Sequence, residues 1–149
     1  PADWNEQKAF EITQAWLTRF GDKVKGVFAA NDGMGMGALE ALRQNGLAGK
    51  VPVVGIDGID AAVAAIEAGE FAGTVAWDPL WTGGMGLAIP YAHATGKIDI
   101  TKEGHEHREF YGTGIIVTKE TVGAFKNNPP KVDFNDLWGK ATGQIQYRG

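Results

Sequence analysis

The stretch Val51-Pro52-Val53-Val54-Gly55-Ile56-Asp57-Gly58 decides the fold of this chain. Its β-branched residues do not alternate with polar ones, which is typical of a strand buried on both faces within a parallel sheet. The strand ends at Asp57, and an acid at the carboxyl end of such a strand points into solvent or toward a ligand. Asp57 is therefore the first candidate for a ligand-binding residue.

Two further apolar runs end in the same way. The run over residues 24–30 leads into Asn31, and the run over residues 71–76 leads into Trp77. Open α/β sheets bind ligands in the crevice beyond the carboxyl ends of their strands. We therefore expect Asn31, Asp57 and Trp77 to contact one ligand.

Helical periodicity fills the segments between these strands. Apolar residues recur at helical spacing over residues 6–20, with Asn5 in position to cap the helix. A second helix is expected over residues 33–45 and a third, capped by Asp60, up to residue 68. Strands that alternate with helices of this length predict right-handed crossovers. The expected fold class is α/β, with a doubly wound parallel sheet.

The pattern changes after Pro79. Residues 80–95 predict a helix, which Pro90 is expected to kink because proline has no N–H for the carbonyl one turn earlier. Beyond it we expect a surface loop, a strand interrupted by glycines, a short helix and another helical turn, at residues 101–107, 110–117, 119–126 and 134–138. Residues 144–149 give no prediction.

The composition limits the classes of function. With 149 residues, 44% of them hydrophobic, the chain is long enough to bury a core, as one domain or a large part of one. The net charge of −4 argues against a nucleic-acid partner, and no apolar run is long enough for membrane insertion. The chain has no cysteine, which excludes a disulfide framework and a thiolate metal site. It begins at Pro1 without a signal sequence, so we expect the natural protein to begin earlier.

The chemistry of the candidate residues suits a sugar. An Asn side chain offers a donor and an acceptor, and an ionised Asp accepts from two hydroxyls at once. A flat aromatic side chain such as Trp4 or Trp77 can cover the C–H face of a sugar ring. Structural roles are also open to these side chains: Asn31 as a helix cap, Asp57 as a turn acid, Trp4 as a hydrophobic staple and Trp77 as a packed hinge residue.

A dinucleotide-binding oxidoreductase domain is the sharpest rival. Residues 33–38 fit the pattern G-x-G-x-x-A between a strand and a helix, and Asp57 stands where a ribose-binding acid would. However, Asn31 and Asp32 separate the strand from the glycines. The Asp32 carboxylate would also stand at the helix N-terminus, where a pyrophosphate binds. One anion there repels another, which disfavours a nucleotide cofactor.

No motif frames a catalytic or metal site. His105 and His107 lie in a polar segment without a cysteine, which favours a surface pair over metal ligands. The chain has no serine, so a Ser-His-Asp triad is impossible. We therefore expect a binding protein that is not an enzyme and that uses neither a metal nor a cofactor.

Several motifs, taken in their order along the chain, carry a family resemblance. They lie at residues 2–5, 27–32 with 37–39, 53–58, 66–69 and 73–76. Together they resemble the second half of a periplasmic sugar-binding protein of an ABC importer, of the ribose- and galactose-receptor type with the type 1 periplasmic-binding-protein fold. The resemblance spans roughly residues 1–118.

This resemblance implies a domain arrangement. Residues 1–77 would form the ligand-binding second lobe of a two-lobed protein. Residues 78–111 would make an excursion toward the first lobe, and residues 112–149 would form a hinge return strand and a C-terminal tail. The first lobe would be absent from this sequence.

The resemblance also implies roles for single residues. Trp4 would stack on the sugar ring, Asn31 and Asp57 would hydrogen-bond its hydroxyls, and Asp32 would cap the following helix. Trp77 departs from the family pattern, in which an amide that binds the sugar is common at this position. This departure leaves the identity of the sugar open.

The implied partners are a small-molecule sugar and the membrane permease of an ABC transporter. The implied location is the periplasm, or the cell exterior by a lipid anchor if the source is Gram-positive. The effector-binding core of a LacI-type transcription regulator resembles the same fold and is the alternative. The native upstream sequence distinguishes the two, because an export signal supports transport and a helix-turn-helix supports regulation.

Overall fold

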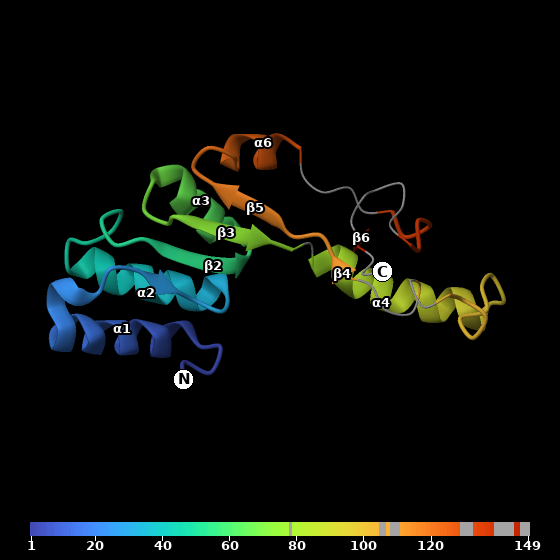
Figure 1. Ribbon diagram of the computed structural model, residues 1–149, viewed down its shortest axis with the longest axis horizontal. Helices are drawn as coiled ribbons and strands as arrows, with labels where there is room; N and C mark the ends of the chain where they lie inside the picture. Colours follow the sequence, from blue (N-terminus) through green and yellow to red (C-terminus); the bar gives the residue numbers. More distant parts are fainter. Residues whose placement is uncertain (78, 105–106, 108–110, 129–132, 139–144, 147–149) are drawn as a thin grey trace. The chain divides into compact units, whose positions relative to one another are not determined.

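The structure is a computed structural model that describes residues 1–77, 79–104, 107, 111–128, 133–138 and 145–146. The chain forms two compact units (Figure 1). The first unit comprises Pro1–Ala76 and Ile115–Pro129, and the second comprises Trp77–Gly114 and Pro130–Gly149. The chain therefore leaves the first unit after the third strand and returns to it at Ile115.

A four-stranded sheet forms the centre of the first unit. Its strands are β1 (Val27–Phe28), β2 (Val53–Asp57), β3 (Gly73–Ala76) and β5 (Ile115–Thr118), in the order β1-β2-β3-β5. The first three strands are parallel, whereas β5 runs antiparallel to β3. The α/β class with a largely parallel sheet is thus confirmed. A strand is expected over residues 110–117, but its antiparallel direction in the sheet is not predicted by the sequence.

The helices of the first unit begin and end close to the expected residues. They are α1 (Glu6–Phe20), α2 (Asp32–Gln44), α3 (Asp60–Ala68) and α6 (Val122–Asn127). Asn5 caps α1, since its Oδ1 accepts from the backbone N–H of Lys8 at 2.8 Å. The predicted cap of α3 is wrong: Ile59 holds the N-cap position, and Asp60 is the first helical residue.

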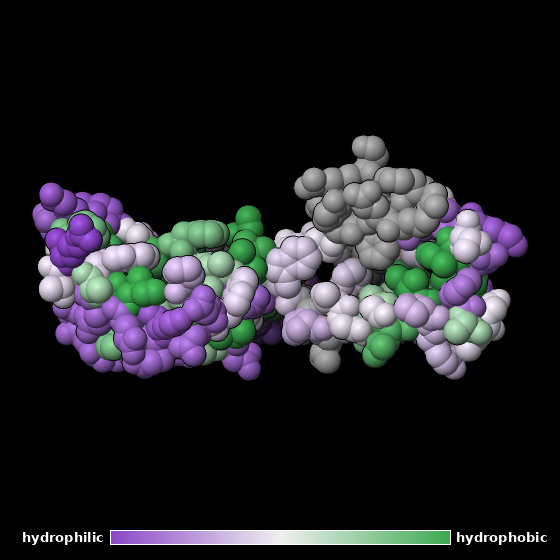
Figure 2. All heavy atoms as spheres, turned by 90° about the horizontal axis from the view of Figure 1, so that it is seen from below, coloured by the Kyte–Doolittle hydropathy of each residue, from purple (hydrophilic) through white to green (hydrophobic). Residues whose placement is uncertain are grey.

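The helices share one hydrophobic core with one face of the sheet. Side chains of α1, α2, α3 and α6 cluster with Val27, Val53 and Val117, which face the same side of the sheet by strand register. The opposite face carries Phe28 and Ile116, which are 75% and 68% exposed. In Figure 2, hydrophobic residues gather toward the upper right of the first unit, whereas its upper left and most of its lower side are hydrophilic.

The prediction that β2 is buried on both faces is therefore wrong for this chain. Val53 and Gly55 are buried, but Val54 and Ile56 on the other face are only half-buried. The cause is that the described helices of this unit all contribute to the core on one side. The apolar residues of the second face (Phe28, Val54, Ile56, Val75 and Ile116) lie side by side through the register of the strands. We call them the open sheet face.

The first strand is shorter than its apolar run. Of the run over residues 24–30, only Val27–Phe28 form a strand, and β1 has β2 as its only partner within the described residues. The backbone N–H of Val27 donates to the carbonyl of Pro52, just before β2, and that of Ala29 donates to the carbonyl of Val54 in β2, each at 2.9 Å. Residues 24–26 therefore lie outside the sheet.

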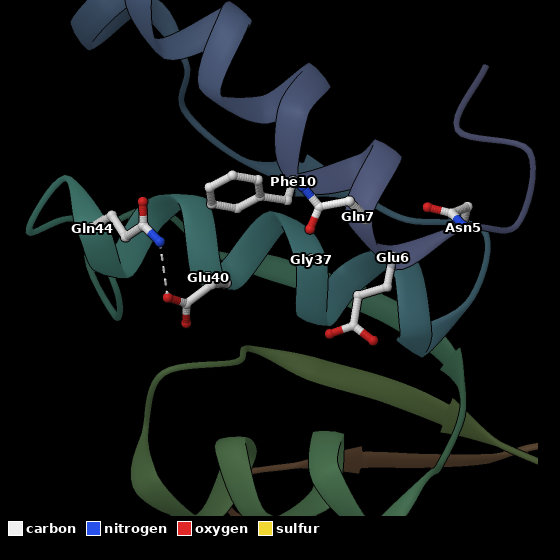
Figure 3. A pocket seen from close by; sticks show the side chains of 7 residues that line it. All are labelled: Asn5, Glu6, Gln7, Phe10, Gly37, Glu40 and Gln44. Carbon is white, nitrogen blue, oxygen red and sulfur yellow. Dashed lines mark hydrogen bonds between the residues drawn. The ribbon is translucent and has the colours of Figure 1, made fainter.

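Helices α1 and α2 pack against each other at Gly37. A Cβ atom at this position would collide with the carbonyl oxygen of Glu6 in α1. Figure 3 shows the two helices meeting here, with the polar side chains of Gln44 and Glu40 alongside and hydrogen-bonded to each other at 3.2 Å. Glycine is required because only a residue without Cβ permits this close approach of two backbones.

The second unit contains one long helix and a small two-stranded sheet. Helix α4 (Pro79–Ala94) continues through Pro90, and Trp81 and Met85 form its buried cluster. Strands β4 (Tyr111–Gly112) and β6 (Ile145–Gln146) pair antiparallel. The helix predicted over residues 134–138 is wrong, because turns occupy this segment. No helix of the described residues is long and apolar enough to cross a membrane.

Candidate ligand-binding site

Three of the predicted site residues lie at one end of the first unit. In Figure 1, α1 and α2 both begin at the end of the sheet where the arrowheads of β2 and β3 lie. Trp4 directly precedes the cap of α1, Asn31 is the cap of α2, and Asp57 is the last residue of β2. The fold therefore brings Trp4, Asn31 and Asp57 to the same end, beyond the carboxyl ends of the parallel strands.

Asn31 is both a helix cap and an available donor. Its Oδ1 accepts a hydrogen bond from the backbone N–H of Met34 at 2.9 Å. Its Nδ2 donates to no group among the described residues, and the side chain is only half-buried. The cap fixes the orientation of the amide, and the two N–H bonds of Nδ2 are left for a ligand.

Asp57 is exposed and held in an unfavourable backbone conformation. Its φ of 126° lies in a region that residues other than glycine rarely adopt. Such conformations cost on the order of 1–3 kcal/mol and gather at functional sites, where the surrounding structure imposes them. Among the described residues, the other non-glycine residues with positive φ are Asp3 and Trp4, at 50° and 58°. Two of the three non-glycine positions with positive φ in the described part of the chain are thus candidate site residues, Trp4 and Asp57.

Trp4 presents its ring to solvent. The side chain is 72% exposed, so it does not act as a hydrophobic staple on α1. The preceding residue, Asp3, forms an ion pair with Lys8 in the first turns of α1. This pair and the Asn5 cap fix the segment from which the indole projects.

Asp32 lies next to Asn31, but it is not the helix cap that the resemblance implied. It is the first residue of α2, fully buried, and its Oδ2 accepts from the backbone N–H groups of Gly58 at 2.7 Å and Ile59 at 3.1 Å. Burial raises the pKa of Asp32 above its ordinary value of 3.8, whereas the neighbouring Thr74 hydroxyl and the hydrogen bonds from Gly58 and Ile59 act in the opposite direction. Sequence reasoning missed this role, because the acceptor and the donors lie in different turns.

Two glycines make room for this arrangement. A Cβ at Gly55 would collide with the carboxylate of Asp32, and a Cβ at Gly58 would lie 2.5 Å from that of Ala76. Gly58 also has a φ of 79°, a conformation that glycine adopts without strain. In the sequence, the two glycines of the Gly55-x-Asp57-Gly58 pattern are the feature from which a close approach of other groups to this turn could have been predicted.

Trp77 belongs to the second unit. Its six-membered ring lies on Gly112, where a Cβ atom would stand 2.6 Å from Cζ3 of the indole. The side chain is 39% exposed. Packing within the second unit thus accounts for part of its surface, and the remainder is open to other contacts.

The histidines of the described residues form no metal site. His107 bonds to the carboxylate of Glu103 at 2.6 Å and stacks on Trp138 with ring centroids 4.2 Å apart. No group of three potential ligands (His, Cys, Asp or Glu) gathers anywhere in the part of the chain that the structure describes. His105 lies outside the described residues.

Residues 1–98 match the family described as "Periplasmic binding protein domain". The chain belongs to the periplasmic binding protein family. A curated relative is the xylitol-binding protein of Mycolicibacterium smegmatis, 40% identical over 96 residues that cover 64% of this chain and 27% of that protein. Another is the D-allose-binding periplasmic protein of Escherichia coli, 40% identical over 99 residues that cover 66% of this chain and 32% of that protein.

A solved structure extends the match to nearly the whole chain. It is a twin-arginine translocation pathway signal protein from Burkholderia phytofirmans, with a TM-score of 0.86 and 47% identity over 99% of this chain and 46% of that one. This periplasmic binding protein chain therefore spans less than half of that structure and about a third or less of the curated relatives. The α/β fold of the family is confirmed.

Proposed function

We propose that this protein binds a sugar or polyol without transforming it and delivers it to an ABC importer. One observation carries the proposal: Asp57, at the carboxyl end of a central strand, is exposed in a backbone conformation that acidic residues rarely adopt. Strain of this kind is retained where the side chain has a function. The family of the chain supports binding rather than catalysis.

Each candidate residue has a distinct role in this proposal. The carboxylate of Asp57 accepts from two hydroxyls, and the Nδ2 of Asn31 donates to a third oxygen. The exposed ring of Trp4 covers an apolar face of the ligand. Trp77 is the second proposed aromatic contact, through the exposed part of its indole. Together these groups match a neutral molecule with several hydroxyls and one C–H face.

The ligand class is a pentose, a hexose or a related polyol. The relatives named above bind xylitol and D-allose, which share vicinal hydroxyls but differ in having an open chain or a ring. Trp77 stands where an amide that binds the sugar is common in the family. An indole can donate a hydrogen bond but cannot also accept one as an amide does. The tryptophan therefore favours a ligand with fewer hydroxyls that need hydrogen-bond partners near this residue.

The wider arrangement follows the family. The first lobe of the whole protein closes on the sugar together with the second lobe formed by residues 1–77, and residues 78–111 belong to the excursion toward the first lobe. The closed protein docks on the membrane permease of the importer in the periplasm or outside the cell. The relatives named for sugar and polyol binding favour this role over that of a LacI-type regulator. The buried Asp32 carboxylate at the start of α2 also opposes the dinucleotide alternative, because it stands where a pyrophosphate would bind.

Calorimetric titration of the natural full-length protein with pentoses, hexoses and pentitols tests the proposal. We expect binding of at least one of them, and we expect Asp57→Ala to weaken it by about 2–4 kcal/mol, because two ligand hydroxyls lose their acceptor in a closed site. Asp60→Ala is the matched control, since this exposed acid lies three residues further on, in α3. Equal affinity of the wild type and Asp57→Ala for the cognate ligand would contradict the proposal.

A further inference from the structure

One buried carboxylate connects the two turns that carry Asn31 and Asp57. The Oδ2 of Asp32 accepts from the N–H of Gly58 at 2.7 Å and from the N–H of Ile59 at 3.1 Å. These residues lie 26 and 27 positions further along the chain. We call this pair of hydrogen bonds the Asp32 bridge.

The Asp32 bridge holds the residues that directly follow Asp57. Asp57 and Gly58 have φ angles of 126° and 79°, so two successive residues lie outside the conformations that most residues adopt. A strained segment stays in place only if other contacts fix it. The two amides that Asp32 accepts are the first two after Asp57, which places the restraint next to the strained residue.

The bridge also fixes the distance between the candidate residues. Asn31 precedes Asp32 directly, and its own side chain is oriented by the cap on Met34. A single side chain thus joins the start of α2 to the turn between β2 and α3. A bridge that loosened would let the two polar groups of the site move apart.

The surroundings of Asp32 leave room for a carboxylate and for little else. The side chain is fully buried, Gly55 provides space at its Oδ1, and the hydroxyl of Thr74 is buried beside it. An apolar side chain of similar size would leave the partly buried N–H groups of Gly58 and Ile59 without this acceptor, which is unfavourable. An amide would preserve the acceptor, because one carbonyl oxygen can accept from both donors.

We infer that Asp32 is a positioning residue for ligand binding, which acts through Asp57 by holding its backbone and through Asn31 by fixing its distance from Asp57. The inference rests on the proposed function, because it assigns to Asp32 the preorganisation of that same site. It contacts no ligand itself, since it is buried.

The test combines ligand affinity with amide hydrogen exchange in the natural full-length protein. Asp32→Ala removes both hydrogen bonds, and we expect affinity for the best ligand to fall by roughly tenfold or more while the amide of Gly58 loses its protection. Asp32→Asn keeps the acceptor, and we expect it to restore the protection and to bring affinity within about threefold of the wild type. Val63→Ala is the control for lost stability alone, because Val63 is a core residue of α3 outside the bridge.

A second variant keeps the test decisive if Asp32→Ala does not fold. Ile59 has a φ of −65°, which proline shares, so Ile59→Pro removes one donor of the bridge while leaving Asp32 intact. We expect this variant to lose affinity by roughly threefold or more. A loss in Ile59→Pro together with recovery in Asp32→Asn supports the inference.

Two results would overturn the inference. One is an affinity for Asp32→Ala or Ile59→Pro equal to that of the wild type. The other is a loss of affinity in Val63→Ala as large as in Asp32→Ala at equal stability. If the wild type binds none of the sugars or polyols, the proposed function fails by itself. In that case unchanged protection of Gly58 in Asp32→Ala would show separately that the bridge does not hold this turn.

Discussion

The backbone of Gly37 in α2 lies directly against the carbonyl oxygen of Glu6 in α1. This contact brings the first turns of α1 and α2 together, and with them the segments that carry Trp4 and Asn31. A glycine in the middle of a helix ordinarily lowers its stability. Here the loss is offset because the close approach aligns the two helices beside the candidate site.

Gly37→Ala should therefore destabilise the protein. The added methyl group forces the helices apart, which we expect to lower the free energy of unfolding by about 1–3 kcal/mol. Gly123→Ala in α6 is the matched control, because a Cβ there meets no atom within 4 Å, and alanine favours a helix by up to about 1 kcal/mol over glycine. Urea unfolding of both variants measures the difference. Equal stability of the two variants would contradict the close helix contact.

Asn31 should show two separable effects. Asn31→Ala removes the cap of α2, and we expect a loss of about 1 kcal/mol in the free energy of unfolding together with weaker ligand binding. Asn31→Asp keeps an acceptor for the N–H of Met34 but removes the Nδ2 donor, so stability should be largely retained while binding weakens. Asn5→Ala gives the cost of a lost cap in α1 for comparison. Wild-type affinity in Asn31→Asp would limit Asn31 to its capping role.

The pH dependence of stability should reveal the buried Asp32. Burial raises its pKa in the folded protein, with the nearby carboxylate of Asp57 acting in the same direction. The folded state thus holds the proton of Asp32 more tightly than the unfolded state. The resulting stabilisation of the folded state is fully present below the ordinary pKa of 3.8, and it is lost as the pH rises through the raised pKa of Asp32 in the folded protein.

Asp32→Asn cannot titrate and should remove this dependence. We expect its stability relative to the wild type to increase as pH rises above about 4 and to level off once wild-type Asp32 is ionised. Urea unfolding of both proteins across that range measures the difference. The exposed acids whose pKa is lowered, such as Glu67 and Glu120, remain in both proteins and cancel in the comparison. A constant difference at all pH values would contradict a raised pKa.

The local elements of this fold could be predicted from the sequence. Propensity, capping and periodicity act within a few residues, so they predict local features. Such features here are the cap at Asn5, the helix ends near Phe20 and Ala68, and the strand that ends at Asp57. The family resemblance through ordered motifs was also correct, because those motifs mark turns at the ends of parallel strands.

Features that depend on long-range contacts could not be predicted in this way. Asn31 and Asp32 both have side chains that can cap a helix. In the structure Asn31 caps α2, whereas Asp32 accepts a hydrogen bond from the N–H of Gly58 in the turn after β2. The sequence alone does not show that Gly58 lies close enough for this. Likewise, apolar strand residues predict burial on both faces, but which faces are covered depends on the layers that pack on the sheet. The exposure of Phe28 shows that the described helices of the first unit cover only the other face of this sheet.

Trp77 should contribute to stability through its contact with Gly112. Trp77→Gln loses the aromatic surface, and we expect it to lower the melting temperature more than Trp77→Phe, which keeps a ring. Ligand titration followed by tryptophan fluorescence in the same variants tests the proposed stacking role. Unchanged affinity in both, with lowered thermal stability, would assign Trp77 to packing and leave Trp4 as the stacking residue.

The open sheet face should make the isolated 149-residue chain associate. Phe28 and Ile116 are 75% and 68% exposed in the midst of half-buried valine and isoleucine side chains, and contiguous apolar surface of this kind drives association. We expect light scattering to show oligomers that become fewer in Phe28→Lys and Ile116→Lys. Leu87→Lys is the comparison, because Leu87 is 76% exposed on α4 in the second unit. If this variant alone reduced association, α4 rather than the open sheet face would be the surface responsible, since each substitution removes one exposed apolar side chain and adds one charge.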